Sequence, residues 1–374
     1  MRGTVTKKRD RWYICYYIGK DATTGKWKQK WEGSWPTKRE AEKVLRSRIE
    51  EQENTFERKA DNSTLAVYLR YWLDSYCASQ LAPNTLCGYR VNVENHIIPK
   101  IGNIQLNRLQ PKDIQSLYDT LRKAGLSDTT IRYVHNNLHK ALRAAVKAQL
   151  IARNPADLVD PPKKDLYEAS PLTPAQSVAL VRACTGKEIF LPVLLALTLG
   201  LRRGEALGLQ WKNVDMSANT VTISHSASFS KGGFSLSSTK TKNSRRTLMM
   251  PEILQSALVA AHLKQAEDAE AFGPGFNPYD LVCCRSDGSP LTSSALQRQF
   301  SAALEEAHLP SIRFHDLRHT NATLMLRNSV PAKIVSAMLG HSSIGITLDV
   351  YSHVMTEMQE GAVEVVDALF KKTC

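Results

Sequence analysis

Five prolines interrupt the middle of the chain, at positions 155, 161, 162, 171 and 174. Proline has no backbone N–H and its ring clashes with the preceding turn, so no continuous helix can cross this stretch. Lys163 and Lys164 lie in it as well. We therefore expect a linker over residues 159–172, with separately folded parts on both sides. A length of 374 residues fits two or three domains in all.

Residues 61–158, before the linker, are expected to form a helical domain. Apolar and aromatic side chains recur there at helical spacing, and proline or serine stands where several of the segments begin. We expect helices over residues 65–76, 83–95, 111–123 and 127–149. A turn is expected over residues 99–103, which contain Pro99 and Gly102.

The first 58 residues are expected to form a small module of strands and one helix. Residues 12–18 are rich in aromatic and β-branched side chains, which is typical of a strand. Residues 26–31 alternate basic and aromatic side chains, which suits a second strand with one face on a core and the other toward solvent. Residues 37–53 indicate a charged helix that begins with a capping box of Thr37 and Glu40.

Residues 173–374, after the linker, are expected to form a mixed α+β domain that is mostly helical. A helix should begin at Thr173, because Pro174 suits a first helical turn and Gln176 completes a capping pair. Residues 190–199 predict a strongly apolar, buried helix. Two strands, over 220–224 and 246–250, and a helix over 292–307 complete the expectation. The whole chain is thus predicted to be multidomain and mainly α.

Three short strings near the C-terminus combine residue types that act on phosphodiesters: 313–320 (RFHDLRHT), 339–343 (LGHSS) and 348–353 (LDVYSH). Arginine can clamp a phosphate, histidine can transfer protons and tyrosine can be a nucleophile. His315 and Arg318 are three residues apart and would share one face of a helix. Residues 331–339 predict a short amphipathic helix that ends at Gly340, which places His341 just beyond it.

Each of these residues also has an ordinary structural interpretation. A tyrosine near a C-terminus is usually a half-buried packing residue, and a histidine after a helix is usually a cap. The spacing of His315 and His319 could suggest a zinc site. However, Asp316 stands where the metalloprotease motif has glutamate, and Arg318 would repel a cation. We expect no metal site, and the ordered set favours the functional interpretation.

The three strings resemble the C-terminal half of the tyrosine recombinases, the phage integrase family. The order and the spacing of the strings both agree with that family. The resemblance implies that Tyr351 is the nucleophile. It also implies that His315, Arg318 and His341 surround the scissile phosphate.

Two further segments extend the resemblance. Residues 200–205 (GLRRGE) match the pattern G-L-R-x-x-E, which implies that Arg202 is the first catalytic arginine and that Glu205 holds it in place. The basic turn between the two expected strands resembles the turn that carries the catalytic lysine, which is then Lys240, with Lys242 as the alternative. A basic loop that only touches phosphates is the plainer interpretation of this turn.

The N-terminal parts resemble the DNA-binding domains of the same family. Residues 1–58 resemble the arm-binding domain of some integrases, and residues 61–158 resemble the helical core-binding domain. Basic side chains in both, and in the turn before the second strand, are candidate DNA contacts. These candidates are Lys28, Lys30, Arg132, Lys140, Arg143, Lys147, Lys242 and Arg245. Each could instead belong to an ordinary solvated face.

The charge is positive and unevenly distributed. The net charge is +13 and the isoelectric point is near 9.4, which predicts an anionic partner. Residues 1–60 carry 16 Lys and Arg against 9 Asp and Glu, and residues 61–165 carry 14 against 9. Residues 166–374 are nearly balanced, at 19 against 18. The basic excess therefore lies in the parts that are expected to grip a phosphate backbone.

The cysteines and the apolar segments indicate the compartment. Seven cysteines are odd in number and scattered, without a C-x-x-C pair, so a disulfide framework is not expected. The longest apolar stretch, 190–201, is too short to span a bilayer, and no signal peptide is evident. We expect a soluble protein in the cytoplasm of a bacterial host.

The expected activity is site-specific DNA recombination through a 3′-phosphotyrosyl intermediate, without ATP or another cofactor. The resemblance implies double-stranded attachment sites as substrate, a homo-tetramer on DNA, and an excisionase or host DNA-bending protein as further partners. The basic N-terminal module favours an integrase of a phage or a conjugative element. The alternative is a non-enzymatic regulator, because residues 331–353 or 129–150 could form a helix-turn-helix.

Overall fold

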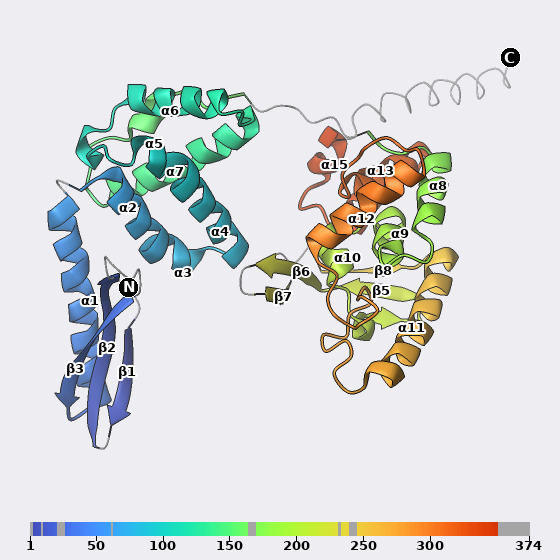
Figure 1. Cartoon of the computed structure of the whole chain (residues 1–374), viewed down its shortest axis with the longest axis horizontal. Helices are drawn as coiled ribbons and strands as arrows, with labels where there is room; N and C mark the ends of the chain where they lie inside the picture. Colours follow the sequence, from blue (N-terminus) through green and yellow to red (C-terminus); the bar gives the residue numbers. More distant parts are fainter. Residues whose placement is uncertain are drawn as a thin grey trace, which may run out of the picture. The chain divides into compact units, whose positions relative to one another are not determined.

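The computed structural model describes residues 3–8, 10–20, 27–60, 63–163, 170–230, 233–238 and 245–350. The chain divides into two compact units, Met1–Leu166 and Tyr167–Cys374 (Figure 1). Their boundary lies inside the predicted linker. The finer division into three domains stays a prediction.

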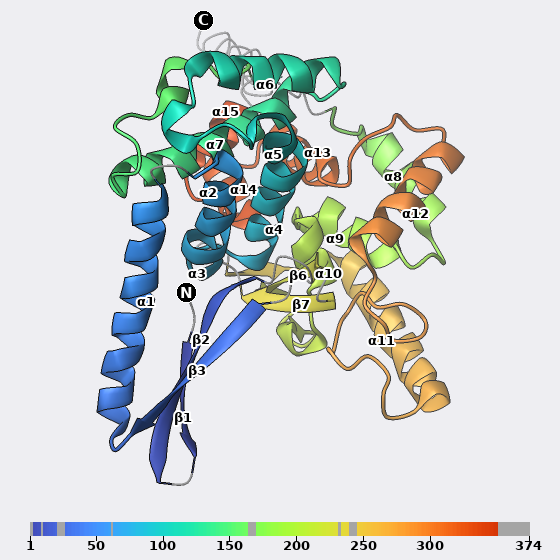
Figure 2. The same cartoon turned by 60° about the vertical axis from the view of Figure 1, so that its left-hand side comes forward.

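The N-terminal module is an antiparallel sheet with one helix on it. The strands are β1 (Gly3–Lys8), β2 (Arg11–Lys20) and β3 (Trp27–Trp35), in the order β1-β2-β3. Helix α1 (Lys38–Ala60) packs along the sheet in both views (Figures 1 and 2). The expected strands and the Thr37 cap are confirmed, whereas β1 was not predicted. Only three residues of β1, Thr4, Val5 and Thr6, are β-branched, so the strand signal in its sequence is short.

The two faces of β3 differ in what they contact. Glu32 accepts hydrogen bonds from Tyr16 (2.6 Å) and Arg48 (3.0 Å) and pairs with Lys30 (2.7 Å). Hydrogen bonds from Lys30 and Tyr16 hold the pKa of Glu32 down to about 2. Trp31 lies on the opposite face and is 49% exposed. Lys30, the basic residue of this alternating stretch, therefore lies on the face of the sheet that packs against α1. The aromatic Trp31 lies on the opposite face.

Residues 63–163 are helical around a continuous apolar core. The first two predicted helices form as α2 (Leu65–Tyr71) with a π-helical turn (Trp72–Cys77) and α3 (Ala78–Gln80), then α4 (Pro83–Val91) with a second π-helical turn (Asn92–Ile97) and α5 (Ile98–Ile101). The last two are α6 (Pro111–Lys123) and α7 (Asp128–Lys147). The expected turn over 99–103 is wrong at its start, because helix continues through Ile101. Pro99 is the second residue of α5 and directly follows the second π-helical turn, where the regular α-helical hydrogen-bond pattern is already interrupted.

The second unit packs helices around a small sheet and a hairpin (Figure 1). The sheet order is β4-β5-β8, from β4 (Val214–Asp215), β5 (Thr220–Ile223) and β8 (Arg246–Met249), and the hairpin is β6 (His225–Ser230) with β7 (Gly233–Ser238). The helices are α8 (Pro174–Cys184), α9 (Phe190–Leu199), α10 (Arg203–Leu207), α11 (Glu252–Phe272), α12 (Ser293–Glu306), α13 (Asp316–Arg327), α14 (Ala332–Leu339) and α15 (Ile344–Val350).

Most sequence expectations for this unit are confirmed. Thr173 and Gln176 exchange the two hydrogen bonds of a capping box, at 3.2 and 2.9 Å. Strands β5 and β8 pair antiparallel, with Thr220 opposite Met249. The hairpin β6–β7 was not predicted, because its serine-rich sequence has weak strand propensity. Among the described residues, no helix combines the length and apolarity that crossing a bilayer requires.

Gly200 ends α9 in the left-handed conformation, with φ +63°, and packs closely against α13 and α14. A Cβ at this position would overlap the side chain of Leu339 and lie 2.8 Å from Asn321 Oδ1. Gly186 also has a positive φ, +77°, but no atom lies within 4 Å of an added Cβ. A comparison of alanine substitutions at the two glycines therefore distinguishes the cost of backbone strain from the cost of steric overlap.

We predict that Gly200→Ala destabilises the protein by about 3 kcal/mol, since left-handed strain and overpacking add. Gly186→Ala should cost only about 1 kcal/mol, because strain alone acts there. Urea unfolding monitored by circular dichroism measures both. Equal losses in the two variants would contradict the packing described for Gly200.

Candidate active site

Arg318 is buried on α13 and connects three segments of the second unit. Its Nη1 donates to the carbonyl of Gly200 and its Nη2 to the carbonyl of Leu339, both at 2.7 Å. These carbonyls belong to the C-terminal ends of α9 and α14, where helix carbonyls lack intrahelical partners and carry partial negative charge. Only 3% of Arg318 is exposed. The guanidinium thus fixes the two helix ends beside α13.

Arg202 lies at the N-terminus of α10 and is oriented by Glu205. Its Nη1 donates to Glu205 Oε1 at 2.8 Å, and its backbone N–H donates to Oε2 at 3.0 Å. A longer bond of 3.5 Å joins Nη2 to the carbonyl of Gly340. The side chain remains 39% exposed, whereas that of Glu205 is only 4% exposed. The carboxylate therefore holds an arginine that solvent, or a phosphate, can reach.

Arg246 is a third arginine of this cluster, and the sequence interpretation missed it. Its Nη2 pairs with Glu205 Oε2 at 2.9 Å, and its Nε donates to the carbonyl of Met338 at 2.6 Å. Only 7% of its side chain is exposed. On strand β8, Arg246 and the buried Leu248 are two residues apart, so their side chains point to the same, inward face, whereas Thr247 between them is exposed. A charged residue at an inward strand position needs a partner, and this signal could have identified it.

Glu205 is a buried carboxylate that stays ionised. Burial alone would raise its pKa, but the hydrogen bonds and positive charges of Arg246 and Arg202 outweigh burial and lower the pKa overall. The carboxylate can therefore serve both arginines as an anionic anchor at neutral pH.

His315 and His341 are both neutral at pH 7. His315 is exposed at the start of α13. Partial burial of its ring, with His319 and Arg318 nearby, lowers its pKa to about 4. Burial and the charges of Arg318 and Arg202 also lower the pKa of His341 to about 4. His341 Nδ1 is hydrogen-bonded to Thr347 Oγ1 at 2.8 Å, which fixes the ring.

The structure thus brings together four of the predicted catalytic residues. Arg202, Arg318 and His341 meet at the end of α14, where Gly340 reverses the chain with φ +68°. His315 lines a cavity together with Arg202. Lys240, Lys242 and Tyr351 lie outside the described residues, so their predicted roles stay predictions. Helix α15 ends at Val350, directly before Tyr351.

Basic candidates for DNA contact lie along one face of α7. Lys140, Arg143 and Lys147 are exposed, at spacings of three and four residues. Lys140 lies over the ring of Tyr89, 5.3 Å from its centroid. Arg132, from the same face, instead donates to the carbonyl of Pro162 at 2.9 Å. The face therefore presents three cations to solvent, and the fourth, Arg132, is bonded to Pro162 in the predicted linker.

The remaining candidates differ in their surroundings. Lys30 is paired with Glu32, which reduces the positive charge it presents. The side chain of Lys28 lies outside the description. Arg245 is exposed just before β8. Lys28, Lys30 and Arg245 therefore remain predicted DNA contacts.

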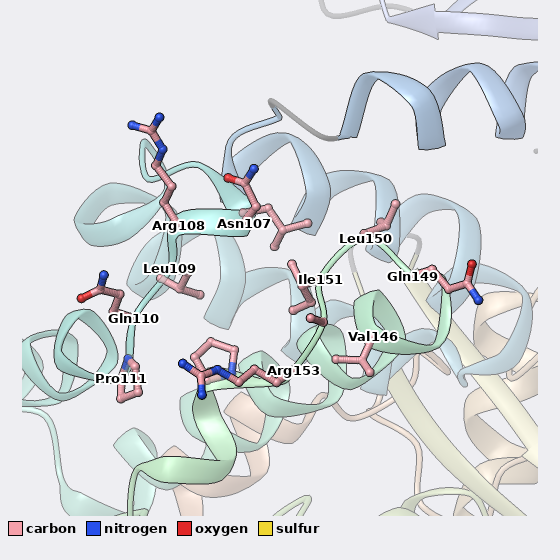
Figure 3. Close-up of a pocket in the computed structure, with 13 residues that line it drawn as sticks. Asn107, Arg108, Leu109, Gln110, Pro111, Val146, Gln149, Leu150, Ile151 and Arg153 are labelled. Atoms are coloured by element: carbon pink, nitrogen blue, oxygen red, sulfur yellow. The ribbon is translucent and has the colours of Figure 1, made fainter.

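A cavity of about 810 Å³ lies in the first unit, between the start of α6 and the segment after α7 (Figure 3). Leu109, Leu150 and Ile151 contribute apolar lining. Figure 3 shows Arg153 extending toward Pro111. The lining includes no histidine, tyrosine or acidic residue, so this cavity is not a candidate for phosphoryl transfer.

Three family profiles match successive parts of the chain. The profile of the phage integrase family matches residues 171–358, which is half of the chain. This chain belongs to the phage integrase family. An N-terminal SAM-like domain of phage integrases matches residues 64–122, and an arm DNA-binding domain matches residues 4–52. The chain is therefore a tyrosine recombinase, as its sequence motifs predicted.

Relatives of this recombinase cover almost its whole length. A XerC-like tyrosine recombinase of Caldanaerobacter subterraneus is 28% identical over 98% of both chains. The ICEBs1 integrase of Bacillus subtilis is 24% identical over 88% of this chain and 89% of its own. A structure of the Tn1549 transposon integrase with transposon right-end DNA has a TM-score of 0.68 at 22% identity, over 80% of this chain and 99% of that chain. The fold class predicted from the sequence is confirmed.

We predict that Arg246→Met destabilises the recombinase by about 3 kcal/mol at pH 7, because it leaves a buried carboxylate with one partner fewer. The pKa of Glu205 should rise in this variant, since burial is less well opposed. Protonation then relieves the penalty, so the loss should shrink as the pH falls from neutral through the raised pKa. Urea unfolding across this pH range measures the effect.

Glu205→Gln provides the control for Arg246→Met. Combined with Arg246→Met, it removes the stranded charge and should recover stability at pH 7. A loss that is the same at every pH, and that Glu205→Gln does not relieve, would mean that Arg246 acts through packing alone.

Proposed function

We propose that this recombinase cleaves and rejoins DNA at specific attachment sites, and thereby integrates or excises a mobile element. The observation that supports this most is the convergence of Arg202, Arg318 and His341 at the end of α14, with His315 beside Arg202. A phosphodiester carries negative charge and needs cationic donors together with groups that transfer protons. Arginines and neutral histidines in one place meet both needs.

The proposed reaction exchanges one phosphoester bond for another. The hydroxyl oxygen of Tyr351 attacks the scissile phosphorus, and the 5′-oxygen of the next nucleotide leaves. A 3′-phosphotyrosyl bond forms, so no ATP is needed. The 5′-hydroxyl of a second strand then attacks the same phosphorus, releases Tyr351 and completes the exchange.

The two arginines would stabilise the charge that develops on the phosphate. Arg202 is partly exposed and oriented by Glu205, so it can donate to a non-bridging oxygen without reorganisation. Arg318 adds a buried positive charge beside it. Water is largely excluded around Arg318, which strengthens its charge, whereas Arg202 stays partly exposed.

Proton transfer would involve the histidines and a lysine. With a pKa near 4, His315 and His341 are neutral and can accept the proton that Tyr351 loses. Thr347 holds His341 by its Nδ1 edge, so Nε2 is the nitrogen that can exchange a proton. Lys240, or alternatively Lys242, would protonate the leaving 5′-oxygen.

The remaining parts would bind DNA and assemble the complex. We assign residues 1–58 to arm-type sites and residues 61–158 to the core site, with 159–172 as the linker to the catalytic domain 173–374. A homo-tetramer would join two sites; lambda integrase, with a TM-score of 0.58 to this chain, has been solved as a tetramer on a Holliday junction. An excisionase or host DNA-bending protein would set direction, in the cytoplasm of a bacterial host.

The first experiment is covalent trapping on nicked DNA from the flanks of the gene. The recombinase should form a protein–DNA band on a denaturing gel without ATP, since the tyrosyl bond survives denaturation. Tyr351→Phe should bind the same DNA equally well in a gel shift and give no such band, because it lacks only the nucleophilic oxygen. A gel shift without a covalent band in the unaltered protein would favour the non-enzymatic regulator.

A second experiment examines the basic face of α7. Arg143→Ala should weaken binding to all DNA sequences alike, and it should reduce the slope of log affinity against log salt by about 0.9 if Arg143 neutralises one phosphate. Lys123→Ala removes an exposed cation of α6 in the same unit and should leave the slope unchanged. Equal slopes for both variants would remove Arg143 from the DNA interface.

A further inference from the structure

Arg313 is held by Asp316 in the same way as Arg202 is held by Glu205. In each case the carboxylate is three residues on, accepts the arginine's own backbone N–H and pairs with its guanidinium. For Arg313 these distances are 2.8 Å from the backbone N–H and 3.0 Å from Nη2. Asp316 is fully buried, while the Arg313 side chain is 54% exposed. The chain therefore builds a second oriented, accessible arginine by the local design it uses for the first.

Both oriented arginines line one cavity of about 550 Å³. Residues from α10, β6, α12 and the start of α13 form it: Arg202, Arg203, Gly204, Ser226, Gln297, Arg313, Phe314 and His315. None of these lining residues is acidic. Arg318 and His341 are not among them, so the cavity extends away from the scissile-phosphate site on the side of Arg202 and His315.

Gly204 allows the hairpin to form one wall of this cavity. A Cβ at this position would overlap Ser226 Oγ and lie 3.0 Å from the carbonyl of Ala227. The close approach brings a serine hydroxyl beside Arg203, which is itself exposed. The wall thus combines cationic groups with neutral hydrogen-bonding groups, Ser226 and Gln297, as a phosphate requires.

We propose that Arg313 and Arg203 bind the DNA phosphate next to the scissile one on the cleaved strand. The proposal rests on the proposed function, because it takes Arg202 as the clamp of the scissile phosphate. Successive phosphates recur at short, regular intervals along a strand, so a cationic cavity that continues from Arg202 receives the neighbouring one. A guanidinium can hold a carboxylate along one edge and a phosphate along another. Holding the strand beside the cleaved bond fixes the phosphorus for in-line attack by Tyr351.

The test is a scan of backbone phosphates with neutral methylphosphonates. The duplex is the one that binds specifically in the gel shift, and the protein carries Tyr351→Phe so that only binding is measured. In this background, one methylphosphonate should weaken binding about tenfold, the loss of one charge-assisted contact. Adding Arg313→Met should weaken binding to the normal duplex by a similar factor and abolish the effect of that methylphosphonate. The position should adjoin the one whose effect Arg202→Met abolishes.

Three variants complete the design. Arg203→Met should show the same coupling as Arg313→Met. Arg313→Lys keeps the charge but loses the bidentate grip on Asp316, so it should retain a reduced sensitivity at the same position. Arg285→Met removes a surface arginine paired with Glu188 in the same unit and should leave the whole scan unchanged. Thermal unfolding of each variant identifies any that fail to fold, and Arg313→Lys then carries the test.

Two results would overturn the proposal. Arg313→Met could leave the sensitivity to every methylphosphonate intact, or it could couple to the same phosphate as Arg202→Met. Failure of the proposed function is distinguished by covalent trapping with Tyr351 restored. If a covalent band forms but Arg313→Met does not abolish the effect of any methylphosphonate, only the second phosphate site is contradicted. If Arg313→Met abolishes that effect but no covalent band forms, only the recombinase chemistry is contradicted.

Discussion

The site depends on the burial of Arg318 between two helix ends. A buried cation is stable only if nearby groups compensate its lost hydration. Here the carbonyls of Gly200 and Leu339 do so at 2.7 Å, and both belong to helix C-termini, where the helix dipole is negative. The arginine in turn brings the ends of α9 and α14 together on α13. Gly340 and His341 follow directly from this packing, so the position of the histidine is a consequence of how Arg318 is solvated.

Around this centre, two of the exposed arginines, Arg202 and Arg313, each have a buried acid behind them. Glu205 lies behind Arg202 and is itself secured by Arg246, and Asp316 lies behind Arg313. The acids restrict the arginines to one orientation before DNA arrives, which lowers the entropic cost of binding a phosphate. The histidines, by contrast, carry no charge at pH 7, so they add proton-transfer capacity without adding to the repulsion among the cations.

The sequence predicted the helices well where local signals were strong. The capping pair of Thr173 and Gln176 and the apolar run of 190–199 determine their helices with little help from the rest of the fold. The motifs selected Arg202, Glu205, His315, Arg318 and His341, and the structure places them close together, while their catalytic roles stay predictions. Arg246 and Arg313 were missed because each depends on a contact with a buried acid. That contact is set by the face of the strand on which Arg246 lies, and by the position of Arg313 just before a helix. The hairpin β6–β7 was missed because contact with α10, and not its own propensity, positions it.

The left-handed glycines at 200 and 340 fix where α9 and α14 end. The position of the arginine-binding carbonyls therefore depends on the exact length of each helix. Each glycine ends a helix at the residue where a carbonyl must face an arginine. Successive residues of an α-helix are rotated by about 100°. Deleting one residue from α14 would therefore turn the Leu339 carbonyl away from Arg318, even if every apolar contact were rebuilt. The lengths of these helices can therefore change only in steps that restore the helical phase.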